Sequence, residues 1–358
     1  MKLKPQFLIG SEKTFLDFIN NIKPEDKVGI ISDAADIDGI LSALLLEDIL
    51  QNKKIKYVPP IFIDRTKEES LLAMQELKKE GVTKIILADL HINGFAPENF
   101  EALRNDFPGD VLLIDHHPTT PEIKNKENII KNPSSFCSAL VIYLLGKENN
   151  LLNYEKFKGL IHATAISEYS FKDPEVLKWL QEDYPDLTIK NRYDLPPGEF
   201  CKEVVSSIIY HRNNIKPVYE LIKEQNWEEI KKLHAIVQTE IDNSFKDAKT
   251  NIENFPDKRL HFYYFNPKFR ITSVVATKLS DENPDDSFIL LSDLPNTNPP
   301  RVKFSARNQN VTKDMSQVLI NAIKGLKDSS AGGHPVSSAG TMPKSEMEKF
   351  KQNLLRAL

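Results

Sequence analysis

In the segment VGIISDAADIDG, residues 28–39, an apolar run passes directly into an acidic turn. The run VGIIS is typical of a strand that is covered on both faces, and a helical pattern follows from Gly39 to Gln51. A strand, a short loop and a helix in this order form the first half of a βαβ unit. The segment therefore predicts a parallel sheet whose first loop carries Asp36 and Asp38.

The same alternation of strand and helix continues to about residue 150. Further strands are expected at residues 56–62, 84–88 and 111–114, with helices at 67–79 and 97–105. Strands separated by helices predict an α/β fold, in which a parallel sheet carries helices on both faces.

A different pattern begins after Phe171, where the chain becomes mostly helical and polar. Strands return near the C-terminus and are expected at 260–265, 287–294 and 301–307. A chain of 358 residues is also long for a single domain. We therefore expect an N-terminal domain at 1–185, a helical connector at 186–256 and a smaller α/β domain at 257–358.

Composition and charge exclude several classes of protein. Hydrophobic residues make up 40% of the chain and charged residues 27%, which excludes global disorder. The net charge of −4 gives no general attraction to nucleic acid, so an anionic substrate would need local positive charge or metal ions. No apolar run reaches membrane-spanning length, no secretory signal is expected, and Cys137 and Cys201 are too few for a disulfide framework. We expect a cytoplasmic protein with no membrane partner.

Three of the expected strands end in side chains that bind metal ions. These residues are Asp36, Asp38, Asp89, Asp115, His116 and His117. The carboxyl ends of parallel strands meet at one edge of a sheet, and carboxylates that lie close together repel unless cations lie among them. Aspartate and histidine without cysteine favour Mn²⁺ or Mg²⁺ over structural zinc. Taken alone, Asp36 and Asp38 are better explained as a helix N-cap, but three coincident strand ends favour a metal site.

Taken in order along the chain, these motifs resemble the DHH phosphoesterase superfamily, in its RecJ-like branch. The resemblance rests on Asp36-Ile37-Asp38-Gly39, Asp89, Asp115-His116-His117, the serine-rich segment 134–139 and Gly332-Gly333-His334. It implies a catalytic DHH domain, a DHH-associated substrate domain at the C-terminus, and two divalent ions, Mn²⁺ preferred or Mg²⁺. Such proteins hydrolyse phosphodiester or phosphoanhydride bonds.

The resemblance also implies a role for each matching residue. The expected metal ligands are Asp36, Asp38, Asp89, which bridges the ions, His116 and Glu168. The expected catalytic residues are Asp115 and His117. The expected substrate-binding residues are Ser305, Arg307, Gly332, Gly333 and His334.

Two positions depart from the family pattern. The family has a histidine four or two residues before the first aspartate, where this chain has Ser32 and Ala34. Either one ion is held more weakly, or Asp33 or His91 replaces the missing ligand. The second departure is Glu168, which stands where the family usually has aspartate and could still reach a metal through its longer side chain.

In the C-terminal domain, Arg301, Lys303, Ser305 and Arg307 alternate along one expected strand. They would share one face and could bind an anion. The alternative is a solvated edge strand whose charges block aggregation. The resemblance favours the binding role for Ser305 and Arg307.

These observations favour a metal-dependent phosphodiesterase, a single-strand-specific exonuclease on DNA or RNA with a role in DNA repair or replication. Two alternatives stay open. One is a weakly active or inactive RecJ-like scaffold that binds GINS or helicase proteins of the replisome. The other is an enzyme that cleaves small substrates such as short oligonucleotides or nucleotides.

Overall fold

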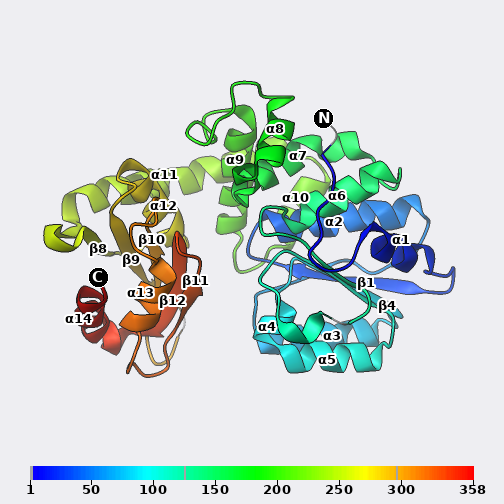
Figure 1. Cartoon of the computed structure of the whole chain (residues 1–358), viewed down its shortest axis with the longest axis horizontal. Coiled ribbons are helices and arrows are strands. Elements are labelled where there is room, and N and C mark those ends of the chain that lie inside the picture. The colour runs from blue at the N-terminus through cyan, green and yellow to red at the C-terminus, as the bar shows by residue number, and fades with distance from the viewer. Residues whose placement is uncertain (1–2, 125, 296) are drawn as a thin grey trace. The chain divides into compact units, whose positions relative to one another are not determined.

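In the computed structural model, which describes residues 3–124, 126–295 and 297–358, the strand formed by the first apolar run pairs in parallel with three others (Figure 1). This central strand is β1 (Lys27–Asp33), and its partners are β2 (Lys56–Tyr57), β3 (Ile61–Ile63) and β4 (Lys84–Ala88). Beyond β4, β5 (Val111–Asp115) and β6 (Ile129–Lys131) continue the parallel sheet in the order β2-β1-β4-β5-β6. The predicted α/β fold with a parallel sheet is confirmed.

The strand expected at 56–62 is in fact two short strands, β2 and β3. Pro59 and Pro60 lie between them. Proline has no N–H to donate to a sheet, so a single continuous strand cannot form across this pair. Both pieces still pair with β1, one at each end.

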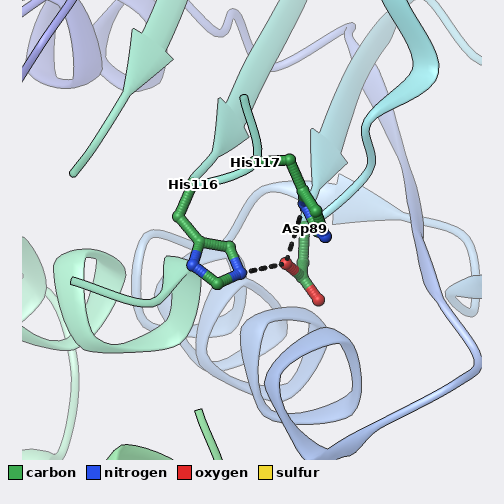
Figure 2. A group of neighbouring side chains, drawn as sticks. All are labelled: Asp89, His116 and His117. Atoms are coloured by element: carbon green, nitrogen blue, oxygen red, sulfur yellow. Dashed lines mark ion pairs between the residues drawn. The ribbon is translucent and has the colours of Figure 1, made fainter. Parts of the chain in front are cut away.

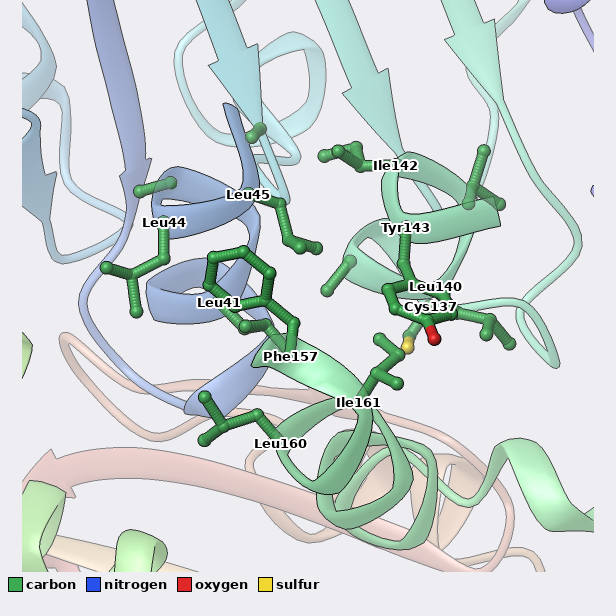
Figure 3. Close-up of a cluster of buried hydrophobic side chains, with 14 of the residues drawn as sticks. Leu41, Leu44, Leu45, Cys137, Leu140, Ile142, Tyr143, Phe157, Leu160 and Ile161 are labelled. Atoms are coloured by element: carbon green, nitrogen blue, oxygen red, sulfur yellow. The ribbon is translucent and has the colours of Figure 1, made fainter. Parts of the chain in front are cut away.

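Alternate residues of each strand face different sides of the sheet, and helices cover both. On one side α2 (Ile37–Asn52), α6 (Ser138–Glu148) and α7 (Tyr154–Ser167) pack their apolar residues together (Figure 3). On the other side lie α3 (Lys67–Lys79) and α5 (Pro97–Asp106) (Figure 1). The remaining helices around this sheet are α1 (Glu12–Asn20) and the short α4 (Ile92–Phe95).

The chain divides into two compact units, Met1–His234 and Ala235–Leu358. The helices that follow the sheet are α8 (Pro174–Gln181), α9 (Pro196–Tyr210), α10 (Lys216–Lys223) and α11 (Trp227–Asn251). Buried residues of α9 and α10, such as Val204 and Val218, belong to the core of the first unit. The segment expected as a connector, 186–256, is therefore shared between the two units, and the division of roles between domains stays a prediction.

The second unit contains a mixed sheet of six strands. They are β7 (Glu253–Phe255), β8 (Leu260–Tyr264), β9 (Ser287–Leu294), β10 (Arg301–Arg307), β11 (Ser330–Gly333) and β12 (Ser337–Pro343). The order is β11-β12-β10-β9-β8-β7, and only β8 and β9 pair in parallel among the described strands. One face packs against α13 (Met315–Ala322) and α14 (Met347–Ala357), and α12 (Thr272–Glu282) contacts β9 and β10.

Within the described residues, none of the helices combines the length and the apolar composition that a membrane span requires.

Candidate metal centre

The register of the parallel sheet brings three aspartates to one edge. Ser32 of β1 lies beside Ala88 of β4, and Ala88 lies beside Ile114 of β5. The residue that follows each of these in the sequence is an aspartate, namely Asp33, Asp89 and Asp115. All three are fully buried, so the sheet itself places a row of carboxylates at its carboxyl edge.

The turn after β1 places two more carboxylates beside this row. Asp36 caps α2, because its Oδ1 accepts the backbone N–H groups of Asp38 and Gly39 at 3.1 and 3.2 Å. The expected capping role is therefore real, and it leaves Oδ2 for other partners. Gly39 lets α2 begin this close to β1, because a Cβ at this position would overlap the backbone carbonyl of Asp33.

Asp38 is held by the N-terminus of a second helix. Its two carboxylate oxygens accept the backbone N–H groups of Ser138 and Ala139 in the first turn of α6, at 2.9 and 2.8 Å. These N–H groups have no partner inside the helix, and the helix dipole favours a negative charge here. The serine-rich start of α6, which the sequence identified as a family motif, thus fixes the orientation of Asp38.

Asp89 and His116 form the centre of the site (Figure 2). Asp89 Oδ1 lies 3.3 Å from His116 Nε2, which is also 3.7 Å from Asp38 Oδ2. The backbone of Asp89 has φ = +55°, which lies in the left-handed region. Residues other than glycine rarely adopt this conformation, and those that do cluster at functional sites. Its second oxygen, Oδ2, is buried and has no hydrogen-bond partner among the described residues. A buried carboxylate oxygen without a donor fits a place for a cation.

His117 is oriented by Asp115, which in turn pairs with Lys131. His117 Nδ1 lies 2.7 Å from Asp115 Oδ1, and Lys131 Nζ contacts the other oxygen. Burial opposes the charge on Asp115, but the hydrogen bond from His117 and the charge of Lys131 hold its pKa well below the usual range. An ionised carboxylate only accepts, so Nδ1 carries the proton and Nε2 is left for a metal or a substrate.

His91 lies beside His117, and the two imidazole rings stack. The imidazoles of His91 and His117 stack with centroids 5.8 Å apart and planes 8° apart. His91 Nε2 is buried and has no hydrogen-bond partner in the described part of the chain. His91 therefore supports His117 and, in this arrangement, does not replace the histidine that the first motif lacks.

Ser32, one of the two positions where the family has that histidine, has a structural role instead. Ser32 is fully buried, and its Oγ lies 2.7 Å from the carbonyl oxygen of Gly39 and 3.0 Å from that of Ala88. The hydroxyl thus ties β1 to α2 and to β4. A serine at this position joins the elements that carry the site but does not reach into it.

The carboxylates raise one another's pKa. Burial and the charge of Asp36 raise the pKa of Asp33 to about 7. Burial, followed by the charges of Asp38, Asp36 and Asp33, raises the pKa of Asp89 well above its usual range. This electrostatic pattern is what a cation would relieve.

Two groups of described side chains lie close enough to share an ion. They are Asp89, His116 and His117, and Asp33, Asp36 and Asp89. Glu168, directly after α7, belongs to neither group, although burial and the charges of Asp36 and Asp38 raise its pKa. Asp38 also belongs to neither group, but its Oδ2 lies 3.7 Å from His116 Nε2. The structure thus places the predicted ligands Asp36, Asp38, Asp89 and His116 close together, and the charges of Asp36 and Asp38 act on Glu168.

Two further residues of the site, Arg65 and Lys131, were not predicted from the sequence. Arg65 follows β3, and its Nη2 lies 2.5 Å from Asp33 Oδ2 and 3.7 Å from Asp36 Oδ2. Lys131 ends β6, a strand of three residues that was not expected. A lone arginine in a loop and a lysine after two isoleucines carry no motif that would have revealed them.

The expected substrate-binding residues of the second unit lie on β10 and β11, the two strands that flank β12, and in the turn after β11. Ser305 of β10 and Gly332 of β11 both pair with Ala339 of β12, so they lie in one row across the sheet. Arg307 lies two residues further along β10, and its Nε donates to Thr277 Oγ1 of α12 at 3.0 Å. Ser305 is buried, and its Oγ has no hydrogen-bond partner among the residues described.

Gly332, Gly333 and His334 form the exposed end of the β11–β12 hairpin. The backbone N–H of His334 donates to Ser337 O at 2.8 Å, and Gly333 has φ = +139°, which favours glycine. These residues are therefore accessible, whereas Ser305 is enclosed.

Comparison with known proteins agrees with this arrangement. Residues 27–166 match the DHH family, N-terminal domain. No curated protein matches the chain in sequence. Among solved structures, RecJ from Thermus thermophilus in complex with Mn²⁺ has a TM-score of 0.70 at 14% identity, covering 97% of this chain and 54% of that one. The chain thus spans about half the length of the Thermus protein.

Two further structures match over nearly their whole length. An exonuclease RecJ bound to manganese has a TM-score of 0.66 at 14% identity, covering 100% of this chain and 96% of that one. CDC45 from Entamoeba histolytica has a TM-score of 0.55 at 10% identity, covering 97% and 98%. At these identities the likeness shows the fold alone. Residues 27–166 therefore match the N-terminal domain of the DHH family, and the chain has the fold of the RecJ structures.

Proposed function

We propose that this protein is a metal-dependent phosphodiesterase that removes mononucleotides from an end of single-stranded DNA or RNA. The observation that carries the proposal is Asp89, whose buried Oδ2 has no partner among the described residues and which lies beside His116 and His117. Aspartate and imidazole together suit Mn²⁺. The RecJ structures of similar fold were solved with manganese.

The residues of the chain divide the work at this centre. Asp38, Asp89 and His116 would hold a divalent ion, and backbone N–H groups of α6 keep Asp38 in position. When bound, such an ion polarises a phosphoryl oxygen and lowers the pKa of water. Burial lowers the pKa of His117 despite the hydrogen bond to Asp115, which favours the neutral imidazole, and Nε2 of that neutral ring would take a proton.

Substrate would be gripped by the second unit. Arg307 brings a permanent positive charge that attracts a phosphate, and the hairpin at Gly332 and Gly333 offers backbone N–H groups beside His334. The chain's net charge of −4 gives no general attraction to a nucleic acid, so affinity has to come from such local donors.

The test is incubation of the full chain with end-labelled single-stranded DNA and RNA in Mn²⁺, Mg²⁺ or EDTA. Mononucleotides should appear only with a divalent ion, and the label reports polarity. Asp89→Ala and His116→Ala should each abolish release while circular dichroism shows a folded protein. Hydrolysis at the wild-type rate in either variant would contradict the metal assignment.

A second candidate is a replisome scaffold with little activity, which would bind GINS or helicase proteins. Ser32 and Ala34 stand at the two positions where the family has a histidine, and Arg65 pairs with two of the carboxylates. The similarity of fold to CDC45 is compatible with this candidate. An inactive wild type that forms a stable complex with GINS proteins would favour it. The pairing of Lys131, Asp115 and His117 favours the enzyme, because a scaffold has no need of an oriented imidazole.

A further inference from the structure

One of the two possible ion sites already contains a cation that belongs to the chain. Asp33, Asp36 and Asp89 each offer an oxygen to a point where an ion could bind. The guanidinium of Arg65 lies at this group, 2.5 Å from Asp33 Oδ2 and 3.7 Å from Asp36 Oδ2. Arginine stays charged at every physiological pH, so this positive charge is permanent.

The second oxygens of Asp33 and Asp36 are also occupied. Asp33 Oδ1 accepts the backbone N–H of Ala35 at 3.0 Å, and Asp36 Oδ1 caps α2. Arg65 therefore lies next to Oδ2 of both carboxylates, the oxygen that makes neither of these backbone contacts. An incoming ion would have to displace the guanidinium from the fully buried Asp33, which would then lose a charge-assisted hydrogen bond.

The other group differs in this respect. Asp89 Oδ2 is buried without a hydrogen-bond partner among the described residues, and His116 Nε2 lies 3.3 Å from Asp89 Oδ1. An ion here would gain ligands without removing an existing cation. Two like-charged groups a few ångströms apart in a buried site repel strongly, so Arg65 and an ion at the Asp33–Asp36 side exclude each other.

We propose that Arg65 takes the place of one metal ion, so that the protein binds a single divalent ion, on the side of the site that holds Asp89 and His116. The inference concerns the metal centre of the function proposed above and rests on it only for the use of a divalent ion. It also accounts for Ser32: with a guanidinium supplying the positive charge, this side of the site has no use for an imidazole ligand.

The proposal is tested by counting Mn²⁺ ions on the full chain, with calorimetric titration and electron paramagnetic resonance. The wild type should bind one ion and give the spectrum of an isolated Mn²⁺. Arg65→Gln should bind two ions, and the spectrum should become that of an exchange-coupled pair, because bridged ions lie about 3.5–4 Å apart. Arg65→Lys keeps the charge and should still bind one.

Arg212→Gln is the matched control. Arg212 also pairs with a carboxylate, Asp64, and its Nη1 lies 3.3 Å from Ala34 O, in the same turn as the site. Because Arg212 contacts none of the three clustered carboxylates, its loss should leave the count at one.

Two ions on the wild type would overturn the proposal, and so would a count of one on Arg65→Gln, or no ion on the wild type. If Arg65→Gln does not fold, the wild-type and Arg65→Lys counts decide. Hydrolysis is measured separately: an inactive wild type with one ion contradicts the exonuclease alone, and an active wild type with two ions contradicts this inference alone.

Discussion

Lys131 on β6 and Asp115 at the end of β5 form an ion pair in which both side chains are fully buried. The same aspartate accepts a hydrogen bond from His117, so one buried lysine fixes the charge that orients the imidazole. Removing one partner of a buried pair leaves an uncompensated charge, which is far more costly than losing an exposed pair.

Lys131→Met should therefore lower the free energy of unfolding by about 3–5 kcal/mol. Urea denaturation at neutral pH measures it. The control is Lys78→Met, which removes a partly exposed partner of Asp106 and should cost at most about 1 kcal/mol. If both variants lose the same free energy of unfolding, the buried pair contributes no more to stability than the exposed pair. The double variant Lys131→Met with Asp115→Leu should recover part of the stability but lose activity.

Asp89→Asn should separate stability from metal binding. Burial and nearby charges raise the pKa of Asp89, so its ionised form destabilises the folded protein as pH rises above the unfolded value. Asparagine removes that charge and tolerates the left-handed backbone at φ = +55°. Without metal, stability should therefore rise at pH 8, and rise less at pH 5.

Mn²⁺ should then raise the melting temperature of the wild type but not that of Asp89→Asn. Thermal unfolding with and without the ion measures both effects. The control is Asp17→Asn. Asp17 is exposed and pairs with Lys13, so this variant should still be stabilised by Mn²⁺. A variant that is less stable than the wild type and still responds to the ion would contradict the prediction.

His162 should make the protein sensitive to acid. Burial lowers the pKa of His162 to about 4, against about 6.5 in an unfolded chain. Between these values the unfolded chain binds the extra proton, so stability present above pH 6.5 is lost as pH falls to 4. The loss should be roughly 3 kcal/mol.

His162→Leu should remove this loss of stability between pH 6.5 and pH 4. Both ring nitrogens of His162 are buried without a hydrogen-bond partner in the described part of the protein, so leucine breaks no hydrogen bond there. Urea denaturation from pH 7 to pH 4 measures it. The exposed His334, replaced by Gln, is the control and should leave the profile unchanged. If His162→Leu loses as much stability as the wild type between pH 7 and pH 4, other groups are responsible for the loss.

The fold was predictable because its signals are local. Strands at 84–88, 287–294 and 301–307 and the helix at 67–79 have the expected bounds, since each has a continuous apolar or helical pattern. The edge strands β6 and β11 have only three and four residues, and β11 is serine, alanine and glycine. Their pairing depends on neighbours far along the chain, which no local pattern reports.

The site was predictable where the sheet positions it and not where distant residues complete it. Asp36, Asp38, Asp89 and His116 follow from strand ends, because parallel strands share one carboxyl edge. Arg65 reaches Asp33 across 32 residues and Lys131 reaches Asp115 across 16. Neither contact leaves a spacing that sequence could show. Both residues bring positive charge to the site. The net charge of −4 had shown that such charge must be local, but not which residues supply it.

Arg307→Ala should weaken the binding of single-stranded oligonucleotide while leaving metal binding intact. Arg307 lies on the same face of β10 as Ser305, and its guanidinium donates to Thr277 and to its neighbour's carbonyl. These contacts fix its direction, and the loss of a charge-assisted hydrogen bond should cost about 1.5–3 kcal/mol of binding free energy. Fluorescence anisotropy measures the oligonucleotide affinity, and calorimetry on the same samples measures Mn²⁺.

Arg301→Ala is the matched control, since Arg301 stands at the other end of the same strand face and donates to Asp328 O and Thr341 Oγ1. It should leave the affinity within about 0.5 kcal/mol of the wild type, as a substitution away from a binding site does. His334→Ala should also weaken binding, because its imidazole lies exposed beside the glycine hairpin. Unchanged affinity in both Arg307→Ala and His334→Ala would remove the second unit from the substrate site, and the scaffold candidate would gain.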